Sequence, residues 1–282
     1  MPEPLHVANG HCTTALIERA GLRGKTSIWA DPLHEGPVPH VDDDQLIRVR
    51  AAFISNGIEV SAGEVENDLK RWRAIVDADE RYSELVLWFE HDLFDQLNLI
   101  QLLSRIGRDR PVRKPVSLVS IDRYPGHPDF KGLGELQPAD IAALWQRRQR
   151  VTSQQYAVAA AAWDAFRSGD RARLRALLTE DTSALPFLAA ALRRYLDEDA
   201  ADGGLTRSER RLIEQLQRGP IDIHRAFAAM HEGESAYHIT DTSFWAMVER
   251  LAARSPALIE VDVRGGAPGR LALPEGTLSL PQ

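Results

Sequence analysis

The sequence predicts an α/β fold: a small parallel, Rossmann-like sheet with helices, followed by a helical region and a winged-helix-like C-terminal module. Short apolar runs alternate with amphipathic helical patterns over the first 136 residues, which is typical of a parallel sheet with helical crossovers. From Gln137 to about residue 200 the strand signal disappears and the periodicity is helical. We therefore expect three parts, covering residues 1–136, 137–200 and 205–282.

Four strands are expected in the first part. The run Leu85–Phe89 (LVLWF) is continuously apolar, as in a parallel strand that is buried on both faces. The other three cover residues 5–8, 26–30 and 116–121, and turn-forming or polar residues follow them. Four strands make a small sheet of this kind.

Helices are expected between these strands. Residues 13–20 and 42–55 carry helical patterns that end at Gly21 and at Asn56-Gly57. Ser61 and Glu64 form a capping-box signature ahead of a third helix, and a fourth begins at Leu93. The two helices between the second and third strands form a large insertion or a cap.

The second half is predicted to be helical until its last strands. Pro138 starts a helix through Arg150, Thr152 caps the next, and two more cover residues 171–178 and 186–197. The acidic stretch 197–204 is a plausible linker. Thr206 then caps a helix, further helices cover 221–231 and 241–254, and strands are expected at 257–263 and 270–273. Three helices and a β-ribbon indicate a winged-helix-like module.

Charge, cysteine content and hydropathy exclude several classes of protein. The net charge of −7 argues against bulk attraction to nucleic acid or to acidic membranes. The single cysteine, Cys12, excludes an internal disulfide and fits a reducing compartment. No apolar run approaches the length of a membrane span, and the N-terminus lacks the regions of a secretory signal. We expect a cytoplasmic protein without a membrane partner.

Polar residues gather where the expected strands end. In an open α/β sheet, ligands bind beyond the carboxyl ends of the strands, where the strand order reverses. Right-handed crossovers make the first and third strands the expected central neighbours. The candidate ligand-binding residues at these ends are Asn9, Gly10, Asp31, Glu35, Asp95, Gln96 and Asp122, beside the trio Glu90-His91-Asp92.

Two chemical roles are open to this cluster. Glu35, Glu90 and Asp92 can hold a divalent cation through oxygen ligands, and His91 beside Glu90 or Asp92 can act as an acid–base pair. The structural alternative is that Asp92 caps the helix that follows and that Asp31 only shapes a turn. A helix needs only one N-cap residue. Capping therefore explains Asp92 alone, but it explains the whole trio Glu90-His91-Asp92 less well.

An anion is the second expected ligand. Asn9-Gly10 and the helix after it can cradle an anion on free backbone N–H groups, although a tight turn explains the same pair. The chain holds no complete GxGxxG, Walker, CxxC, HExxH or GxSxG motif, so dinucleotide-binding, P-loop, zinc-site and α/β-hydrolase functions lack their signatures. Near the helix start, Cys12 is either a thiol with a lowered pKa or inert packing.

Two further segments leave alternatives open. The loop 123–136 is rich in Gly and Pro and carries Tyr124 and Phe130, so it is either a lid over the ligand or a packed connector. The third helix of the C-terminal module has a balanced charge and offers Trp245 and Met247, where a recognition helix offers Arg, Lys, Asn or Gln. A protein partner is therefore favoured over DNA.

Several runs carry a family resemblance. HVANGH, WADPLHEGPVP, WFEHDLFDQLNLIQLL and YPGHPDFKGLGELQPADIAALWQRRQRVTSQQ resemble the bacterial family catalogued as domain of unknown function 1835. LTRSERRLIEQL and ITDTSFWAMVERLA resemble its companion C-terminal domain. The resemblance implies an α/β domain, a helical middle and a small helical C-terminal domain, and it implies no reaction. His11 stands where the family motif is expected to have an aspartate, which puts that aspartate's role in doubt here.

Two hypotheses follow. The first is an enzyme or binding protein for a phosphorylated or nucleotide-like ligand, tested first as metal-assisted hydrolysis. In it Glu35, Glu90 and Asp92 hold a cation, His91 is the acid or base, and Asn9 with the first helix holds an anionic group. The alternative is a non-catalytic regulatory or adaptor protein whose C-terminal module contacts a protein.

Overall fold

The computed structural model describes residues 2–56, 60–108, 114–200, 204–264 and 273–281. The chain divides into two compact units. The first comprises Met1–Ser55 with Val60–Leu192, and the second comprises Asn56–Glu59 with Arg193–Gln282. The helices after residue 137 therefore belong, up to Leu192, to the same unit as the sheet.

The sheet of the first unit has the order β2-β1-β3-β4-β5. Its first four strands are parallel, and the short β5 runs antiparallel to β4 at the edge. The strand order reverses between the neighbours β1 and β3, as right-handed crossovers predict. The strands are β1 (Leu5–Ala8), β2 (Lys25–Ile28), β3 (Leu85–Trp88), β4 (Val116–Val119) and β5 (Gln149–Arg150).

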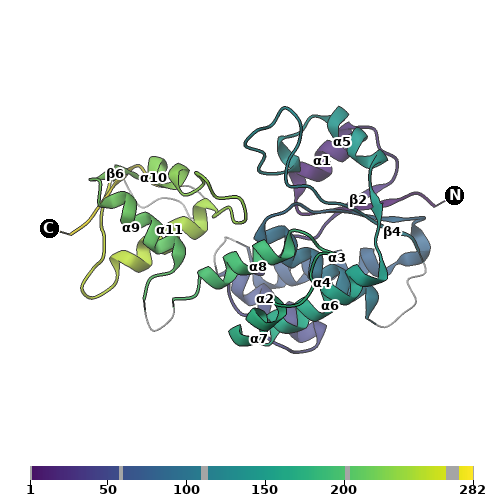
Figure 1. Ribbon diagram of the computed structural model, residues 1–282, viewed down its shortest axis with the longest axis horizontal. Coiled ribbons are helices and arrows are strands. Elements are labelled where there is room, and N and C mark those ends of the chain that lie inside the picture. The colour runs from purple at the N-terminus through teal and green to yellow at the C-terminus, as the bar shows by residue number, and fades with distance from the viewer. Residues whose placement is uncertain (1, 57–59, 109–113, 201–203, 265–272, 282) are drawn as a thin grey trace. The chain divides into compact units, whose positions relative to one another are not determined.

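Helices cover both faces of this sheet (Figure 1). α1 packs with α5 on one face, and α4 packs with α6 on the other, where α2 and α3 also lie. This is the mixed α/β architecture that the alternating pattern predicts. The helices are α1 (His11–Arg19), α2 (Asp43–Ser55), α3 (Ala62–Asp77), α4 (Leu93–Gly107), α5 (Pro138–Gln146), α6 (Ser153–Arg167), α7 (Arg171–Leu177) and α8 (Leu188–Asp197), whose residues after Leu192 belong to the second unit.

Local signals explain where most of these helices begin. The capping box predicted at Ser61 is formed, and Thr152, predicted as a cap, also forms a capping box. The helix predicted over residues 138–150 is too long, because α5 ends at Gln146 and Gln149–Arg150 form β5. Between them, Arg148 donates to the carboxylate of Glu84 at 3.0 Å, and this contact fixes the chain in its turn toward the sheet edge.

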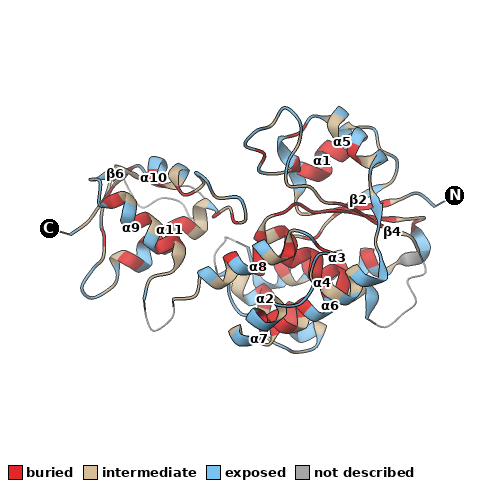
Figure 2. Cartoon of the chain, viewed as in Figure 1, coloured by how far each residue is buried: buried red, intermediate tan, exposed pale blue. Residues whose placement is uncertain are grey.

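Burial concentrates on the sheet and on α4, most of whose residues are buried (Figure 2). β1, β3 and β4 are buried along their whole length. The opposite face packs on α1, α5 and the segment 130–136, whose residues Phe130, Leu133 and Leu136 belong to one apolar cluster. The segment 130–136 thus packs into the core through these three side chains.

The second unit contains three helices and a small antiparallel sheet. The elements follow the order α9 (Arg207–Leu216), β6 (Ile221–Asp222), α10 (Ile223–Ala229), α11 (Asp241–Ala252), β7 (Glu260–Val263) and β8 (Gly276–Ser279). The sheet order is β6-β8-β7. The sequence predicted the three helices, but it placed β6 inside a helix. Of the predicted strand 270–273, residues 270–272 lie outside the described residues, and the last strand is Gly276–Ser279.

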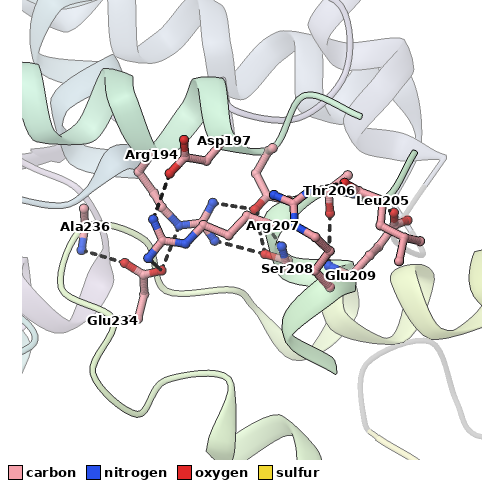
Figure 3. Close-up of polar contacts among 11 residues, drawn as sticks. Arg194, Asp197, Leu205, Thr206, Arg207, Ser208, Glu209, Glu234 and Ala236 are labelled. Atoms are coloured by element: carbon pink, nitrogen blue, oxygen red, sulfur yellow. Dashed lines mark hydrogen bonds and ion pairs between the residues drawn. The ribbon is translucent and has the colours of Figure 1, made fainter. Parts of the chain in front are cut away.

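A buried ionic cluster lies at the start of this unit (Figure 3). Arg194 donates to the Glu234 carboxylate at 2.7 Å and to the Ser208 hydroxyl at 3.0 Å, and it also binds the carboxylate of Glu198. Its guanidinium lies over the ring of Tyr237, at 4.8 Å from the centroid. Arg194 thereby joins the end of α8 to the start of α9 and to the 234–237 segment.

None of the helices in the described part of the chain has the length and the apolar character that a membrane crossing needs.

Candidate functional site

The central contact of the candidate site joins the ends of β1 and β3. The Asn9 side-chain amide, directly after β1, donates to Oε2 of Glu90, two residues after β3, at 2.8 Å. Thr13 donates in turn to the Asn9 side-chain oxygen at 3.2 Å, which orients the amide. The strand order reverses between these two strands, which is where open α/β sheets bind ligands.

The Glu90 carboxylate is enclosed on its other side by the segment 130–136. Its Oε1 accepts the backbone N–H of Leu133. A Cβ added to Gly132 would lie 3.1 Å from Oε1 and 3.2 Å from Oε2, so a larger residue here would require the Glu90 carboxyl group or the segment to shift by a few tenths of an ångström. Glu90 is 4% exposed. We call Asn9, Gly10, Glu90, Asp95 and the segment 130–136 the strand-end site.

Glu90 also faces a second carboxyl group. The interaction of the two side chains lowers the pKa of Glu90 and raises that of Asp95. Oδ2 of Asp95 accepts the backbone N–H of Glu90, whereas Oδ1 is buried and has no hydrogen-bond partner among the described residues.

Burial sets the acidity of this pair. It is the main cause that raises the pKa of Glu90 to about 7, and the charge of Asp92 adds to it. Hydrogen bonds from Asp95, Leu133 and Asn9 act in the opposite direction. Burial and the charge of Glu90 raise the pKa of Asp95 well above its ordinary value. Its pKa of about 7 allows Glu90 to accept and release a proton near neutral pH.

The first turn of α4 supports Glu90 rather than adding further ligands. Asp92 is the N-cap, and its carboxylate accepts the Asp95 backbone N–H at 2.9 Å. Gln96 is buried and donates to the Glu90 backbone oxygen at 2.6 Å. Asp92 therefore has the capping role that was the structural alternative, and Gln96 fixes the chain at Glu90.

His91 lies apart from these contacts, in an aromatic setting. It is 8% exposed, and its ring centroid lies 6.3 Å from that of Phe130 and 6.2 Å from that of Phe187. Its Nδ1 is buried with no hydrogen-bond partner in the described part of the chain. The trio Glu90-His91-Asp92 thus divides into a buried carboxylate, an aromatic-packed imidazole and a helix cap.

Across from Glu90, α1 begins without a side-chain cap. Gly10 stands at the N-cap position in an extended conformation, and no side chain accepts from the first-turn N–H groups. A Cβ built on Gly10 would meet nothing within 4 Å, so space is open above the helix start. Cys12, two residues further, is exposed. The arrangement leaves N–H donors and a positive helix end available to an anion.

Asp31 and Glu35 are engaged elsewhere. Asp31 is 2% exposed and binds the fully buried Arg50 at 2.8 Å. Arg50 also donates to the backbone oxygens of Glu35 at 2.7 Å, of Pro32 at 2.9 Å and of Pro37 at 3.2 Å. Arg50 therefore holds the 31–37 loop together, and among the described residues no contact joins Asp31 to Glu90.

Asp122, at the end of the β4 segment, forms an ion pair with its neighbour Arg123 at 2.9 Å. The Arg123 hydrogen bond lowers the pKa of Asp122, and the charge of His91 contributes a smaller lowering. Asp122 is therefore near His91 but bound to a surface arginine, and it takes no part in the contacts of Glu90.

The predicted cation site is not assembled. Within the described ranges, no three His, Cys, Asp or Glu side chains are grouped as metal ligands. The reason lies in the partners of the expected set. Glu90 is bonded to Asn9 and Leu133, Asp92 caps α4, and a Glu35 oxygen lies 3.4 Å from His34. Glu35, Glu90 and Asp92 thus have other partners among the described residues, and their binding of a divalent cation stays a prediction.

Sequence reasoning missed four residues that shape these contacts. Leu133 binds Glu90 through its backbone, so its side chain gives no signal of the contact. Gly132 and Gly134, which approach Glu90 and Cys12 closely, were visible only as loop glycines. Arg50 is one of several charged residues in an amphipathic helix, so the sequence does not show that it is buried and pairs with Asp31.

Comparisons of the chain with models of known protein families and with curated proteins found no match in either set.

Proposed function

We propose that the strand-end site binds a small phosphorylated or nucleotide-like ligand, with its anionic group at the start of α1 and with Glu90 as the acid–base group. The observation that carries the proposal is the Asn9–Glu90 contact at the reversal of strand order, beside an uncapped helix start with open space at Gly10. The unbonded N–H groups at the start of α1 are donors for the phosphate oxygens, and a crevice for a ligand is expected where the strand order reverses.

Glu90 supports acid–base work in this proposal. A carboxyl group whose pKa lies at about 7 can take a proton and return it at neutral pH. Leu133 is fully buried and donates to Oε1, so a ligand reaches Glu90 only when the segment 130–136 moves aside. The segment then acts as the lid that its composition suggested, and Asn9 remains to orient the carboxylate.

Cys12 provides the test, because it is the only cysteine of the chain and is exposed beside the proposed phosphate position. Adenosine monophosphate and inorganic phosphate are added separately while a thiol reagent labels the folded protein. We expect adenosine monophosphate to slow the labelling. Gly10→Leu, which places a side chain in the open space, should abolish this protection without unfolding the chain. Equal labelling rates with and without either anion, or protection that survives Gly10→Leu, would contradict the proposal.

A second function is proposed for the C-terminal unit. Its order of helix, strand, two helices and two strands, with the sheet order β6-β8-β7, supports a winged-helix-like module. Its third helix does not favour DNA. Arg250 and Arg254 both lie near the buried carboxylate of Glu209, at 3.8 and 3.7 Å, so their charges are partly engaged within the unit.

We propose that this module contacts a protein. A titration with duplex DNA at two salt concentrations separates the alternatives, because phosphate contacts weaken steeply with salt. We expect no salt-sensitive binding. Tight binding that falls by about a factor of 100 or more between 50 and 200 mM salt would overturn the protein assignment.

A further inference from the structure

The strongest unassigned feature is a cavity of about 780 Å³ in the first unit. It is lined by residues from α4, α6 and the 40–42 segment, and none of the strand-end residues contributes to it. Pockets of this size are typical of small-molecule sites. We call it the α4–α6 cavity.

A buried arginine forms part of its lining. Arg167 is 6% exposed and lies at the end of α6. Its Nε donates to the backbone oxygen of Pro39 at 3.1 Å, and its Nη2 donates to the backbone oxygens of Pro39 and Val41. No residue in the described ranges accepts from its Nη1. Arg167 is thus fixed by two neutral carbonyls and keeps its positive charge without a carboxylate partner.

Other donors without partners line the same cavity. The hydroxyl groups of Ser104 and Tyr156 have no acceptor among the described side chains and backbone atoms, and the exposed Arg108 forms no ion pair with a described carboxylate. The charge of Arg108 is close enough to lower the pKa of Arg167, although burial is the larger cause. Two guanidinium groups therefore face one cavity.

The two acids of the lining are bonded to other partners, while the charges of Asp164 and of nearby Asp43 act on Arg167 and raise its pKa against the larger effect of burial. Asp164 binds His40 at 3.0 Å and Arg173 at 2.6 Å. Asp42 accepts the backbone N–H of Gln45 at 2.8 Å, at the start of α2. The polar groups of the lining that have no partner are hydrogen-bond donors, so they suit a ligand whose polar atoms are all acceptors.

The rest of the lining is apolar and flat. Trp163 is buried beside Arg167, whose guanidinium lies 5.5 Å from its ring centroid. Ala157, Ala160 and Gly107 lie around it, and the Tyr156 ring packs at Gly107. Small residues and aromatic rings accommodate a planar, apolar body.

We infer that the α4–α6 cavity binds a small organic oxyanion, a flat apolar body that carries a carboxylate or phosphate group. The oxyanion lies between Arg108 and Arg167 and accepts from Tyr156 and Ser104, and the body packs on Trp163 and the alanines of α6. This site is independent of the strand-end site, so either can exist without the other.

The test is calorimetric titration of the full chain with phenyl phosphate, benzoate and the cation benzyltrimethylammonium. Both anions should bind, and the cation should not. Arg108→Gln and Tyr156→Phe should each weaken anion binding by about three- to tenfold, the effect of removing one charged or polar contact. Arg19→Gln is the matched control, because Arg19 is also exposed at a helix end but does not line the cavity, and it should bind as the parent does.

Other results would overturn the inference. The inference fails if neither anion binds at millimolar concentration, or if benzyltrimethylammonium binds as strongly as the anions. It also fails if Arg108→Gln and Tyr156→Phe both bind the anions as the parent does. Anion binding that is lost in Gly10→Leu but kept in Arg108→Gln would place the anion at the strand-end site instead. Circular dichroism and thermal unfolding of each variant verify that the measured protein is folded.

Discussion

The side-chain amide of Asn9 donates to the Glu90 carboxylate at 2.8 Å, and this bond spans the point where the strand order reverses. The two residues are 81 positions apart in the chain. The buried Glu90 carboxylate accepts hydrogen bonds from this amide and from the backbone N–H of Leu133. The acid–base property of the site therefore rests on burial and on hydrogen bonds.

The pH dependence of stability follows from Glu90. Its pKa is raised by burial from 4.5 to about 7, so the unfolded chain releases this proton at lower pH than the folded chain does. The stability linked to Glu90 is therefore fully present below pH 4.5 and is lost as the pH rises to 7. A difference of about 2.5 in pKa corresponds to about 3 kcal/mol at most.

We expect Glu90→Gln to remove this component. Urea unfolding of the parent and of Glu90→Gln at pH 5, 6, 7 and 8 should show the parent losing stability relative to the variant between pH 5 and 7. Glu180→Gln, at an exposed position, is the control and should follow the parent. A constant difference between the parent and Glu90→Gln across this range would show that Glu90 titrates as an ordinary carboxyl group.

Arg50 should be essential to the 31–37 loop. Arg50→Met leaves Asp31 buried without its cation, and we expect a loss of about 3–5 kcal/mol in the free energy of unfolding. Arg48→Met, at an exposed position of the same helix, should change it by less than about 0.5 kcal/mol. Denaturant unfolding measures both. Equal, small effects would contradict the role of Arg50 as the partner that buried Asp31 requires.

Two glycines of the strand-end site should respond differently to the same change. Gly132→Ala places a Cβ about 3 Å from the Glu90 carboxyl group, so we expect a loss of about 1–3 kcal/mol as the segment shifts. In Gly10→Ala the added Cβ meets no atom within 4 Å, and the backbone at Gly10 is extended. The stability of this variant protein should therefore be nearly that of the parent. Thermal unfolding of the two variants decides; similar losses would contradict the close packing of Gly132 on Glu90.

The ionic cluster of the second unit should weaken in acid. Burial alone would raise the pKa of Glu234, but the hydrogen bond and charge of Arg194 outweigh it and hold that pKa below its ordinary value. The stability linked to Glu234 is thus present above pH 4.5 and lost as the pH falls through its lowered value. We expect Arg194→Met to cost about 3 kcal/mol at pH 7 and less in acid, whereas the exposed neighbour change Arg193→Met should cost little.

Proteolysis or hydrogen exchange of residues 193–282 reports on this cluster at each pH. An effect of Arg194→Met that is equal at pH 3 and pH 7 would mean that the charge of Glu234 does not contribute. The control Arg193→Met isolates the cluster from the helix propensity of α8.

The sequence determined the features that depend on local pattern. A short β-favouring run located β1 and a continuous apolar run located β3, and the turn-forming or polar residues after them placed Asn9 and Glu90 at strand ends. The handedness of crossovers then made β1 and β3 neighbours, which brought the two residues to one edge. Capping signatures at Ser61 and Thr152 likewise act within a few residues, so they could be recognised without the fold.

Only the tertiary structure decided which polar groups are free to act. Asp31, Asp92 and Glu90 look alike as acids after strands, yet one pairs with a buried arginine, one caps a helix and one is held by the Leu133 backbone. Asp31 and its partner Arg50 are 19 positions apart, Asp92 and the Asp95 N–H that it caps are 3 apart, and Glu90 and Leu133 are 43 apart. The periodicity of the sequence does not show which of these contacts forms. Burial, which raises the pKa of Glu90, is likewise a property of the packed chain, because it depends on what the rest of the fold places over the carboxylate.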